Sequence, residues 1–344
     1  MIGSACASSC RGLSLVELLV STALGLLLTA GMAALYLEYK RHYFYDEQLA
    51  RLQENGRYAT RLLSRELAMA GFFAGSLSAA EIPAVAIGRD CNADGWALDA
   101  SRSLDMVNDY SPPADITTTA GTSLACLEGG TIAAGSDMLA IKRTAALASL
   151  ENGLIASGLA ASRSERWFLR VQADRVPQWH RIKPVELVSL AGSGETAAWW
   201  QAVAKIFYVR RYSDPENSSD DLPTLCVEAL VSDAMSTRCL VEGVENLQLE
   251  LGVDSDGDGV ANRFLSAPQM AEMQQVVAVR FYLLLRSLAP VTGYRNEKNY
   301  RLGEMLVPAR EDGFLRRVFS ATVSLRNRVR LISGNDRGAC NAVG

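Results

Sequence analysis

The chain has 344 residues, a net charge of −4 and 49% hydrophobic residues. This length fits one large domain or two ordinary ones, and this composition is that of a globular protein rather than a disordered one. A mildly acidic chain is not a general nucleic-acid binder, so nucleic acid is not an expected partner. The two histidines, His42 and His180, have the spacing of neither a zinc site nor a nucleophile–base pair, which argues against an enzyme.

The first predicted element is an apolar helix over residues 13–37, in which Glu17 is the only charged side chain. About 20 apolar residues are enough for a helix to cross ~30 Å of hydrocarbon. A carboxylate inside that layer costs on the order of 2.5–3.5 kcal/mol at the centre and less near an edge. Since a simple anchor has no need of this cost, Glu17 indicates a function that involves a partner of opposite charge.

Two simpler interpretations of the same segment leave Glu17 unexplained. One is a secretory signal peptide with Arg11, an apolar core and a small-residue site in "TAGMAA"; the other is a plain signal anchor. The orientation is also ambiguous. Lys40 and Arg41 follow the segment and would place the rest of the chain in the cytoplasm, whereas the cysteines favour an oxidising compartment.

The helix is predicted to continue beyond the membrane as an amphipathic half over residues 38–71. Apolar residues recur three or four positions apart, which predicts a stripe for a domain to pack on. Gly56 fills the one gap in this stripe and should be a soft spot costing ~1 kcal/mol relative to alanine, and Gly71 is a suitable end. The whole helix would be roughly 85 Å long. The stripe consists of Leu49, Leu52, Ala59, Leu63, Leu67 and Ala70.

Residues 72–135 are rich in Ala, Gly, Ser and Asp and are predicted to form a loop-rich insertion. A β-rich globular head should follow over residues 136–335, with a short tail at 336–344. Strands dominate the head, so the predicted fold class is α+β, a long helix packed on antiparallel sheet. The strand-like runs are residues 136–143, 166–172, 184–190, 204–212, 224–230, 239–253, 276–287 and 316–332.

The cysteines that follow the helix are widely spaced and form no CxxC pair, which argues against zinc and for disulfides. Cys226 and Cys239 flank a turn between two strand-like runs, so they could face each other across a hairpin. Cys91 with Cys126 is the second predicted pair, and Cys340 is left over. The alternative is that these residues are reduced, buried thiols.

The segment "GVDSDGDGVANRF" has alternating aspartates in a flexible loop, a pattern that suits Ca²⁺. The candidate ligands are the side chains of Asp254, Asp256, Asp258 and Asn262 and the carbonyl of Val260. The twelfth position of the loop is a leucine instead of the bidentate glutamate, and the flanks are strand-like, so the loop is not an EF-hand. Any site should therefore bind Ca²⁺ weakly, with a Kd of ~10⁻⁴–10⁻³ M. The alternative is a solvated Asp/Gly hairpin turn.

A short leader ending in Gly12, then Leu13, then Glu17 at the start of an unbroken apolar helix, resembles the type IV prepilin signature. The resemblance implies that residues 1–12 are a leader, that a membrane-embedded prepilin peptidase cuts after Gly12, and that the new amino terminus at Leu13 is methylated. The family usually has Phe at this position. Glu17 would then meet the amino-terminal ammonium of a neighbouring subunit, a contact that low dielectric strengthens.

Residues 11–75 and about 237–330 resemble PilW-like minor pilins. The motifs "QENGRYATRLLSRELAMAGFF", "LVEGVENLQLELGVDSDGDGV", "VVAVRFYLLLRS" and "GFLRRVFSATVSLRNR" follow one another in this order. This resemblance implies a subunit that enters the inner membrane once, with its head in the periplasm, and helps to initiate pilus assembly in a complex at the pilus tip. Its implied partners are other minor and major pilins, the prepilin peptidase, the inner-membrane assembly platform and a tip adhesin.

Two other functions remain open from the sequence. One is a J-type minor pseudopilin of a type II secretion system, whose members share the amino terminus but are usually shorter. The other is a calcium-dependent adhesive tip subunit that uses residues 72–135 as its contact surface. No nucleophile with a base and an orienting group is visible, so we do not expect an enzyme.

Overall fold

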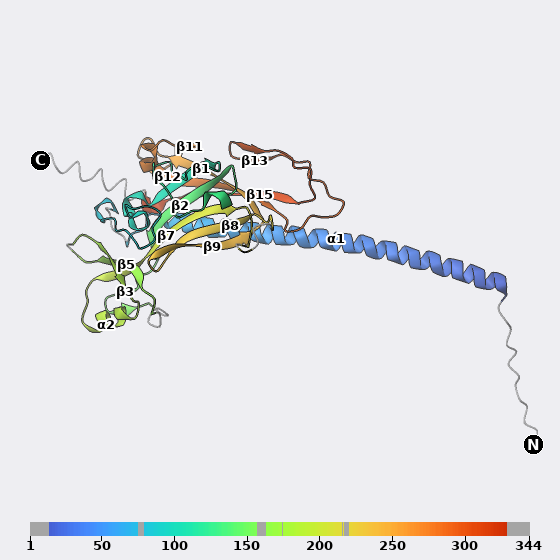
Figure 1. Cartoon of the computed structure of the whole chain (residues 1–344), viewed down its shortest axis with the longest axis horizontal. Coiled ribbons are helices and arrows are strands. Elements are labelled where there is room, and N and C mark those ends of the chain that lie inside the picture. The colour runs from blue at the N-terminus through green and yellow to red at the C-terminus, as the bar shows by residue number, and fades with distance from the viewer. Residues whose placement is uncertain are drawn as a thin grey trace, which may run out of the picture.

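The computed structural model describes residues 14–74, 79–156, 163–173, 175–214, 216 and 220–328. It consists of one long helix that carries a head of antiparallel sheets on its carboxyl-terminal half (Figure 1). This arrangement confirms the predicted α+β fold class. The predicted leader, residues 1–12, and the tail at 336–344 lie outside the described residues, as do Leu13 and Cys340.

Helix α1 (Leu15–Met69) is continuous through both predicted halves. From Leu15 to Asp46 every residue is exposed, so about 48 Å of helix projects beyond the head at ~1.5 Å per residue. From Gln48 onward one side of the helix is buried, and this side contains Leu52, Ala59, Leu63 and Leu67 of the predicted stripe. The helix ends just before Gly71, whose positive φ of 77° lets the chain turn away.

The head contains a nine-stranded and a four-stranded sheet, and all their paired strands are antiparallel. In the larger sheet, β7 is the longest strand and pairs along its length with β2, β8, β3 and β5. Its strands are β1 (Leu104–Tyr110), β2 (Ser136–Thr144), β3 (Leu150–Glu151), β4 (Leu154–Ile155), β5 (Arg166–Val171), β6 (Gln178–Ile182), β7 (Ala198–Arg210), β8 (Thr224–Val231) and β9 (Ala234–Glu242).

The smaller sheet has the order β11-β10-β12-β15, and a separate hairpin joins β13 to β14. Helix α1 packs mainly on β15 and β12, and it also reaches β9 and β2 of the larger sheet. The helix therefore holds the two sheets together from one side. These strands are β10 (Val244–Val253), β11 (Arg263–Leu265), β12 (Val276–Arg286), β13 (Tyr300–Leu302), β14 (Met305–Val307) and β15 (Arg316–Ser324).

The two sheets are also joined by buried polar contacts between β2 and β10. Asp137 accepts hydrogen bonds from the backbone N–H groups of Asp109 at 2.8 Å and Leu249 at 2.7 Å. The backbone N–H of Leu247 donates to the hydroxyl of Ser136 at 3.2 Å. Burial raises the pKa of Asp137, and the hydrogen bonds from the two backbone N–H groups lower it by a smaller amount. The resulting pKa is about 7.

Three parts of the strand prediction were wrong in detail. The run 184–190 is not a strand, because helix α2 (Glu186–Gly192) occupies most of it and buries Leu187. A run this short fits both the helical and the strand periodicity, and Pro184 lacks the N–H that a strand would use in its ladder. The run 239–253 is two strands that Gly243 separates with a positive φ of 82°. The last run ends as a strand at Ser324.

Residues 72–135 supply strand β1, several short 3-10 helices and a second hydrophobic core. Trp96, Leu98 and Leu124 are almost fully buried there against the outer face of the larger sheet. The first core lies between α1 and the two sheets. A third, small cluster joins α2 to Phe168 and Trp199 in the lobe at the lower left of Figure 1.

Gly56 is a site of close packing, not the soft spot that the sequence predicted. A Cβ atom at this position would lie 2.2 Å from two ring atoms of Phe319 on β15. No real contact is that short, so the ring would have to move. Glycine here lets the helix approach the sheet more closely than any other residue would.

We expect Gly56→Ala to destabilise the head by about 1–3 kcal/mol, although alanine has the higher helix propensity. The matched control is Gly192→Ala in α2, where a Cβ meets nothing within 4 Å. Thermal unfolding of both variants of the full chain in detergent measures the difference. An unchanged Gly56→Ala melting temperature would show that Phe319 moves aside without cost.

Candidate functional site

The amino end of α1 is closed by a capping box between Ser14 and Glu17. The backbone N–H of Glu17 donates to the hydroxyl of Ser14, and the backbone N–H of Ser14 donates to the Glu17 carboxylate, both at 3.2 Å. Such a box satisfies two free donors of the first turn, and an acid is favourable there. In the single chain, Glu17 thus binds its own helix start, directly next to the predicted amino terminus. Gly12 and Leu13, the predicted cleavage and methylation positions, lie outside the described residues.

The apolar half of α1 has the length and composition of a membrane span. Among the described residues, it contains the one helix segment that is long and apolar enough to cross a membrane. None of its most apolar part is buried against the head. Tyr36, Tyr39 and Tyr43 lie where the apolar segment ends, and they are 60–70% exposed. Tyrosine is enriched at membrane–water interfaces, so these residues fit the boundary of the span.

A buried ionic cluster around Glu66 fixes the second half of the helix to the larger sheet. The Glu66 carboxylate receives Nη2 of Arg143 at 2.8 Å and Nζ of Lys205 at 2.6 Å, from strands β2 and β7. Only 8% of the Glu66 side chain is exposed. Burial raises the pKa of Glu66, but the hydrogen bonds and charges of Lys205 and Arg143 outweigh it, so the pKa lies below its usual value.

Sequence reasoning missed this cluster, although a signal was present. Glu66 lies between Leu63 and Leu67, on the face that the apolar stripe predicts to be buried. An acid on a buried helix face needs a partner of opposite charge. Arg143 and Lys205 are far away in the sequence, and only the pairing of β2 with β7 brings them together.

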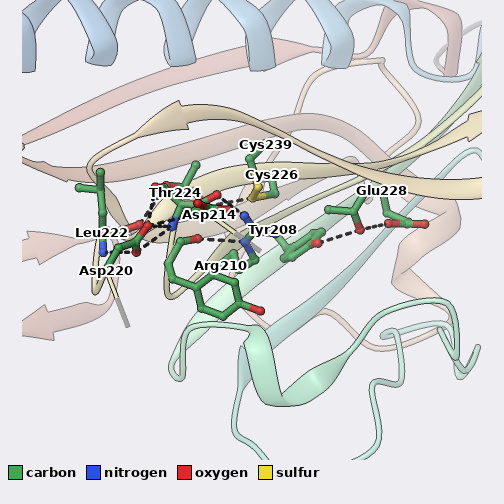
Figure 2. The surroundings of a disulfide bond; sticks show 12 residues. Tyr208, Arg210, Asp214, Asp220, Leu222, Thr224, Cys226, Glu228 and Cys239 are labelled. Carbon is green, nitrogen blue, oxygen red and sulfur yellow. Dashed lines mark hydrogen bonds between the residues drawn. A yellow bond between two sulfur atoms is a disulfide. The ribbon is translucent and has the colours of Figure 1, made fainter. Parts of the chain in front are cut away.

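Both predicted disulfides are present. Cys226 and Cys239 are directly opposite on β8 and β9, with Cα atoms 3.9 Å apart, as the hairpin predicted. Figure 2 shows this bond below α1, with Tyr208 and Glu228 on one side and the turn held by Asp220 on the other. Cys91 and Cys126 are paired within the insertion, with Cα atoms 4.3 Å apart.

Asp220 holds a turn in the segment that joins β7 to β8. Its carboxylate accepts from the backbone N–H groups of Ser213 and Leu222, each at 3.0 Å. Burial raises the pKa of Asp220, but these hydrogen bonds and that of the Ser213 hydroxyl bring it down to about 2. The carboxylate therefore stays ionised and functions as a structural acceptor.

The aspartate loop lies between β10 and β11, and it gathers the three predicted carboxylates. Asp254, Asp256 and Asp258 each offer an oxygen within 4.8 Å of the others. The loop also uses them itself: the backbone N–H groups of Gly257 and Gly259 donate to Asp254 at 2.7 Å each. Burial raises the pKa of Asp254, but these donors outweigh it and hold the pKa below its usual value.

The remaining predicted ligands lie in the same turn and take part in its hydrogen bonds. Asn262 accepts from the backbone N–H of Ser255 at 2.7 Å, and its amide donates to Asp256 at 3.1 Å. The backbone N–H of Val260 donates to Asp258 at 2.7 Å. The flanks are strands and Leu265 ends β11, in agreement with the prediction that this is not an EF-hand. The carboxylates suit a hard cation, whereas the side-chain oxygen of Asn262 already accepts the hydrogen bond from Ser255 that it would have to share or release to serve as a ligand.

Together, the fold and these contacts define a class: an α+β protein in which one helix of membrane length carries an antiparallel head fixed to its second half. Residues 206–327, about a third of the chain, match the family model "Type IV Pilus-assembly protein W". The predicted resemblance to PilW-like proteins is thereby confirmed, and it connects the chain to the proteins of type IV pili.

Comparison with solved structures gives a type IV-like pilin from Thermus thermophilus. The alignment covers 81% of this chain and 97% of that protein, with 12% sequence identity and a TM-score of 0.36. A similarity of this size supports no conclusion about fold or function. No curated protein matches the chain.

Proposed function

We propose that the chain is a minor pilin subunit of a type IV pilus, which helps to initiate pilus assembly as part of a tip complex. The observation that carries this proposal is helix α1, whose exposed apolar half continues without a break into a half that is fixed to the head. The family match over residues 206–327 supports the same function. The role of such a subunit is structural.

In this proposal the prepilin peptidase cleaves after Gly12, and Leu13 becomes a methylated amino terminus. The chain is then held in the inner membrane by α1, with its disulfide-bonded head in the periplasm. An oxidising compartment is the environment in which disulfides persist, which supports this orientation. Other minor and major pilins, the assembly platform and a tip adhesin are the partners.

The intact mass of the chain from cells with and without the prepilin peptidase tests the processing. We expect a form that starts at Leu13 and is one methyl group heavier, and we expect it only when the peptidase is present. A form that starts beyond Ala33 would point instead to an ordinary signal peptide. Loss of piliation on deletion, with secretion intact, would separate a pilus subunit from a pseudopilin.

Glu17 has a role in this proposal that its capping box alone does not explain. In an assembly, the carboxylate would leave the Ser14 backbone for the ammonium of a neighbouring subunit, because opposite charges attract strongly in low dielectric. We expect Glu17→Leu to reduce incorporation into pili about tenfold or more, which corresponds to ~1.4 kcal/mol. Quantification of the chain in sheared pili measures this.

The matched control is Glu38→Leu, an exposed acid on the same helix beyond the apolar segment. It forms a surface pair with His42 at 3.2 Å and should be neutral. If Glu17→Leu and Glu38→Leu were both incorporated as well as the wild type, electrostatic docking through Glu17 would be wrong.

We further propose that the aspartate loop binds Ca²⁺ weakly, because three carboxylates lie within 4.8 Å of one another. Calorimetric titration of the full chain should give a Kd of ~10⁻⁴–10⁻³ M. Asp256→Asn should weaken binding about tenfold and keep the loop intact, since Asp254 makes the bonds to Gly257 and Gly259. Asp94→Asn, another exposed aspartate, is the control. Equal binding by both variants would place any cation elsewhere.

A further inference from the structure

The exposed face of α1, opposite the head, carries a ridge of arginines that no function described above uses. Arg57, Arg61 and Arg65 are each four residues apart, so they lie one above another on successive turns of the helix. All three are exposed, and none forms an ion pair or hydrogen bond with any residue that the structure describes. Tyr58 lies beside them and is 52% exposed. We name this surface, Arg57, Tyr58, Arg61 and Arg65, the basic ridge.

The basic ridge is unfavourable for the single chain. Like charges four residues apart on a helix repel each other, and here the repulsion acts twice in succession. The other half of the same face shows the usual arrangement, since Arg51 is paired with Glu47 one turn before it, at 2.7 Å. Arg51 thus has an acidic partner on its own helix, whereas the structure describes no such partner for Arg57, Arg61 or Arg65.

We infer that the basic ridge docks an acidic helix of another subunit in the assembly, with carboxylates at three- or four-residue spacing. A helix with that spacing would place an acid against each arginine along one line, and guanidinium groups bind carboxylates with two hydrogen bonds. Tyr58 would supply apolar contact at the centre of the patch. This inference rests on the proposed function, because it requires a neighbouring subunit whose helix runs beside α1.

The membrane surface does not fit as the partner. Arg57 lies about 30 Å along the helix from the end of the apolar segment at Leu37, at ~1.5 Å per residue. Electrostatic attraction to anionic lipids decays within a Debye length, about 8 Å at physiological ionic strength. The basic ridge is therefore beyond the reach of the surface in which α1 is anchored. Nucleic acid is also disfavoured, because the chain as a whole carries a net charge of −4.

Arg61→Glu separates docking from folding. In the single chain the introduced carboxylate would attract both Arg57 and Arg65, so two repulsive pairs become attractive and the helix should be at least as stable as in the wild type. In the assembly the same change places an acid against the acidic partner. We expect incorporation into sheared pili to fall about tenfold or more, with no decrease in melting temperature.

The matched control is Arg326→Glu, which makes the same charge change at an exposed arginine with no ion pair to any described residue. It should be incorporated like the wild type. If the wild type itself is absent from pili, the proposed function fails. If the wild type and Arg61→Glu are recovered equally, the docking inference fails and the proposed function stands.

A photocrosslinker at position 58 of the full chain, in cells, identifies the partner. We expect crosslinks to a helical segment of another pilin that carries at least two acids, and reversal of one of these to arginine should rescue Arg61→Glu. Crosslinks to sheet or loop segments, or no rescue, would overturn the inference. So would salt-dependent binding of the purified chain to a DNA duplex that Arg61→Glu abolishes, because the ridge would then be a nucleic-acid surface.

Discussion

Glu66→Ala should cost the protein about 3–5 kcal/mol of stability, the largest effect that we expect from one substitution. Removal of one partner of a buried ion cluster leaves the others without compensation. Arg143 and Lys205 are only 12% and 23% exposed, so their charges would remain largely out of water after the change. The expected result is a head that separates from α1 at a lower temperature, because these contacts join the helix to β2 and β7.

Glu54→Ala is the matched control, since it removes an exposed glutamate from the same helix and should change stability by less than about 0.5 kcal/mol. Thermal unfolding of the full chain in detergent, with near-ultraviolet circular dichroism, measures both. For a domain of this size, a loss of 3–5 kcal/mol lowers the melting temperature by roughly 6–20 °C. Equal melting temperatures of the two variants would show that the Glu66 cluster contributes nothing to the packing of α1 on the head.

The effect should also depend on pH. The pKa of Glu66 in the folded protein is below its value of 4.5 in the unfolded chain. Its contribution is therefore present above pH 4.5 and is lost as the pH falls through the lower, folded value. The difference between wild type and Glu66→Gln should accordingly be large at pH 7 and shrink below pH 4.5. A difference that grew on acidification would contradict the ion pairing.

The sequence was most informative where a local pattern decides the structure. The stripe from Leu52 to Leu67 predicted the buried side of the helix, and the turn between Cys226 and Cys239 predicted a hairpin and its disulfide. These features depend on residues close in the chain. The strand assignment of residues 184–190 was wrong because a run of seven residues fits both the helical and the strand periodicity. In the structure, these residues form a helix whose Leu187 packs in the small cluster with Phe168 and Trp199.

Features that depend on distant parts of the chain could not be predicted in the same way. From the sequence alone, Gly56 is predicted to be a weak point of the helix. The structure shows that it lies against Phe319, which is far away in the sequence. In the sequence, Glu66 looks like an ordinary acid of an amphipathic helix. In the structure, strands β2 and β7 place Arg143 and Lys205 next to it. In both cases the sheet order determines the contact, and no local periodicity encodes that order.

The insertion shows the same limit, and it leads to the second large expected effect. Residues 72–135 have weak sequence patterns and little regular structure, yet they bury Trp96 and Leu98 against the larger sheet. A segment with few strand-to-strand hydrogen bonds depends more strongly on a disulfide bond to keep its folded conformation. The bond between Cys91 and Cys126, 35 residues apart, closes most of it into one loop.

Replacement of both Cys91 and Cys126 by alanine should destabilise the chain by about 4 kcal/mol, according to the chain-entropy cost of a 35-residue loop. The loop would gain freedom in the unfolded chain, and few hydrogen bonds would hold it in the folded one. Limited proteolysis should therefore cut between residues 92 and 125 in the variant and leave the wild type intact there.

The matched control is replacement of both Cys226 and Cys239 by alanine. Their separation is only 13 residues, so the same relation gives about 3 kcal/mol. Seven further residue pairs of β8 and β9 maintain this hairpin, so the measured loss should be smaller still and proteolysis within it should not increase. If the two double variants lost equal stability and the insertion stayed resistant to proteases, the second core alone would hold the insertion, and its disulfide would be dispensable for the fold.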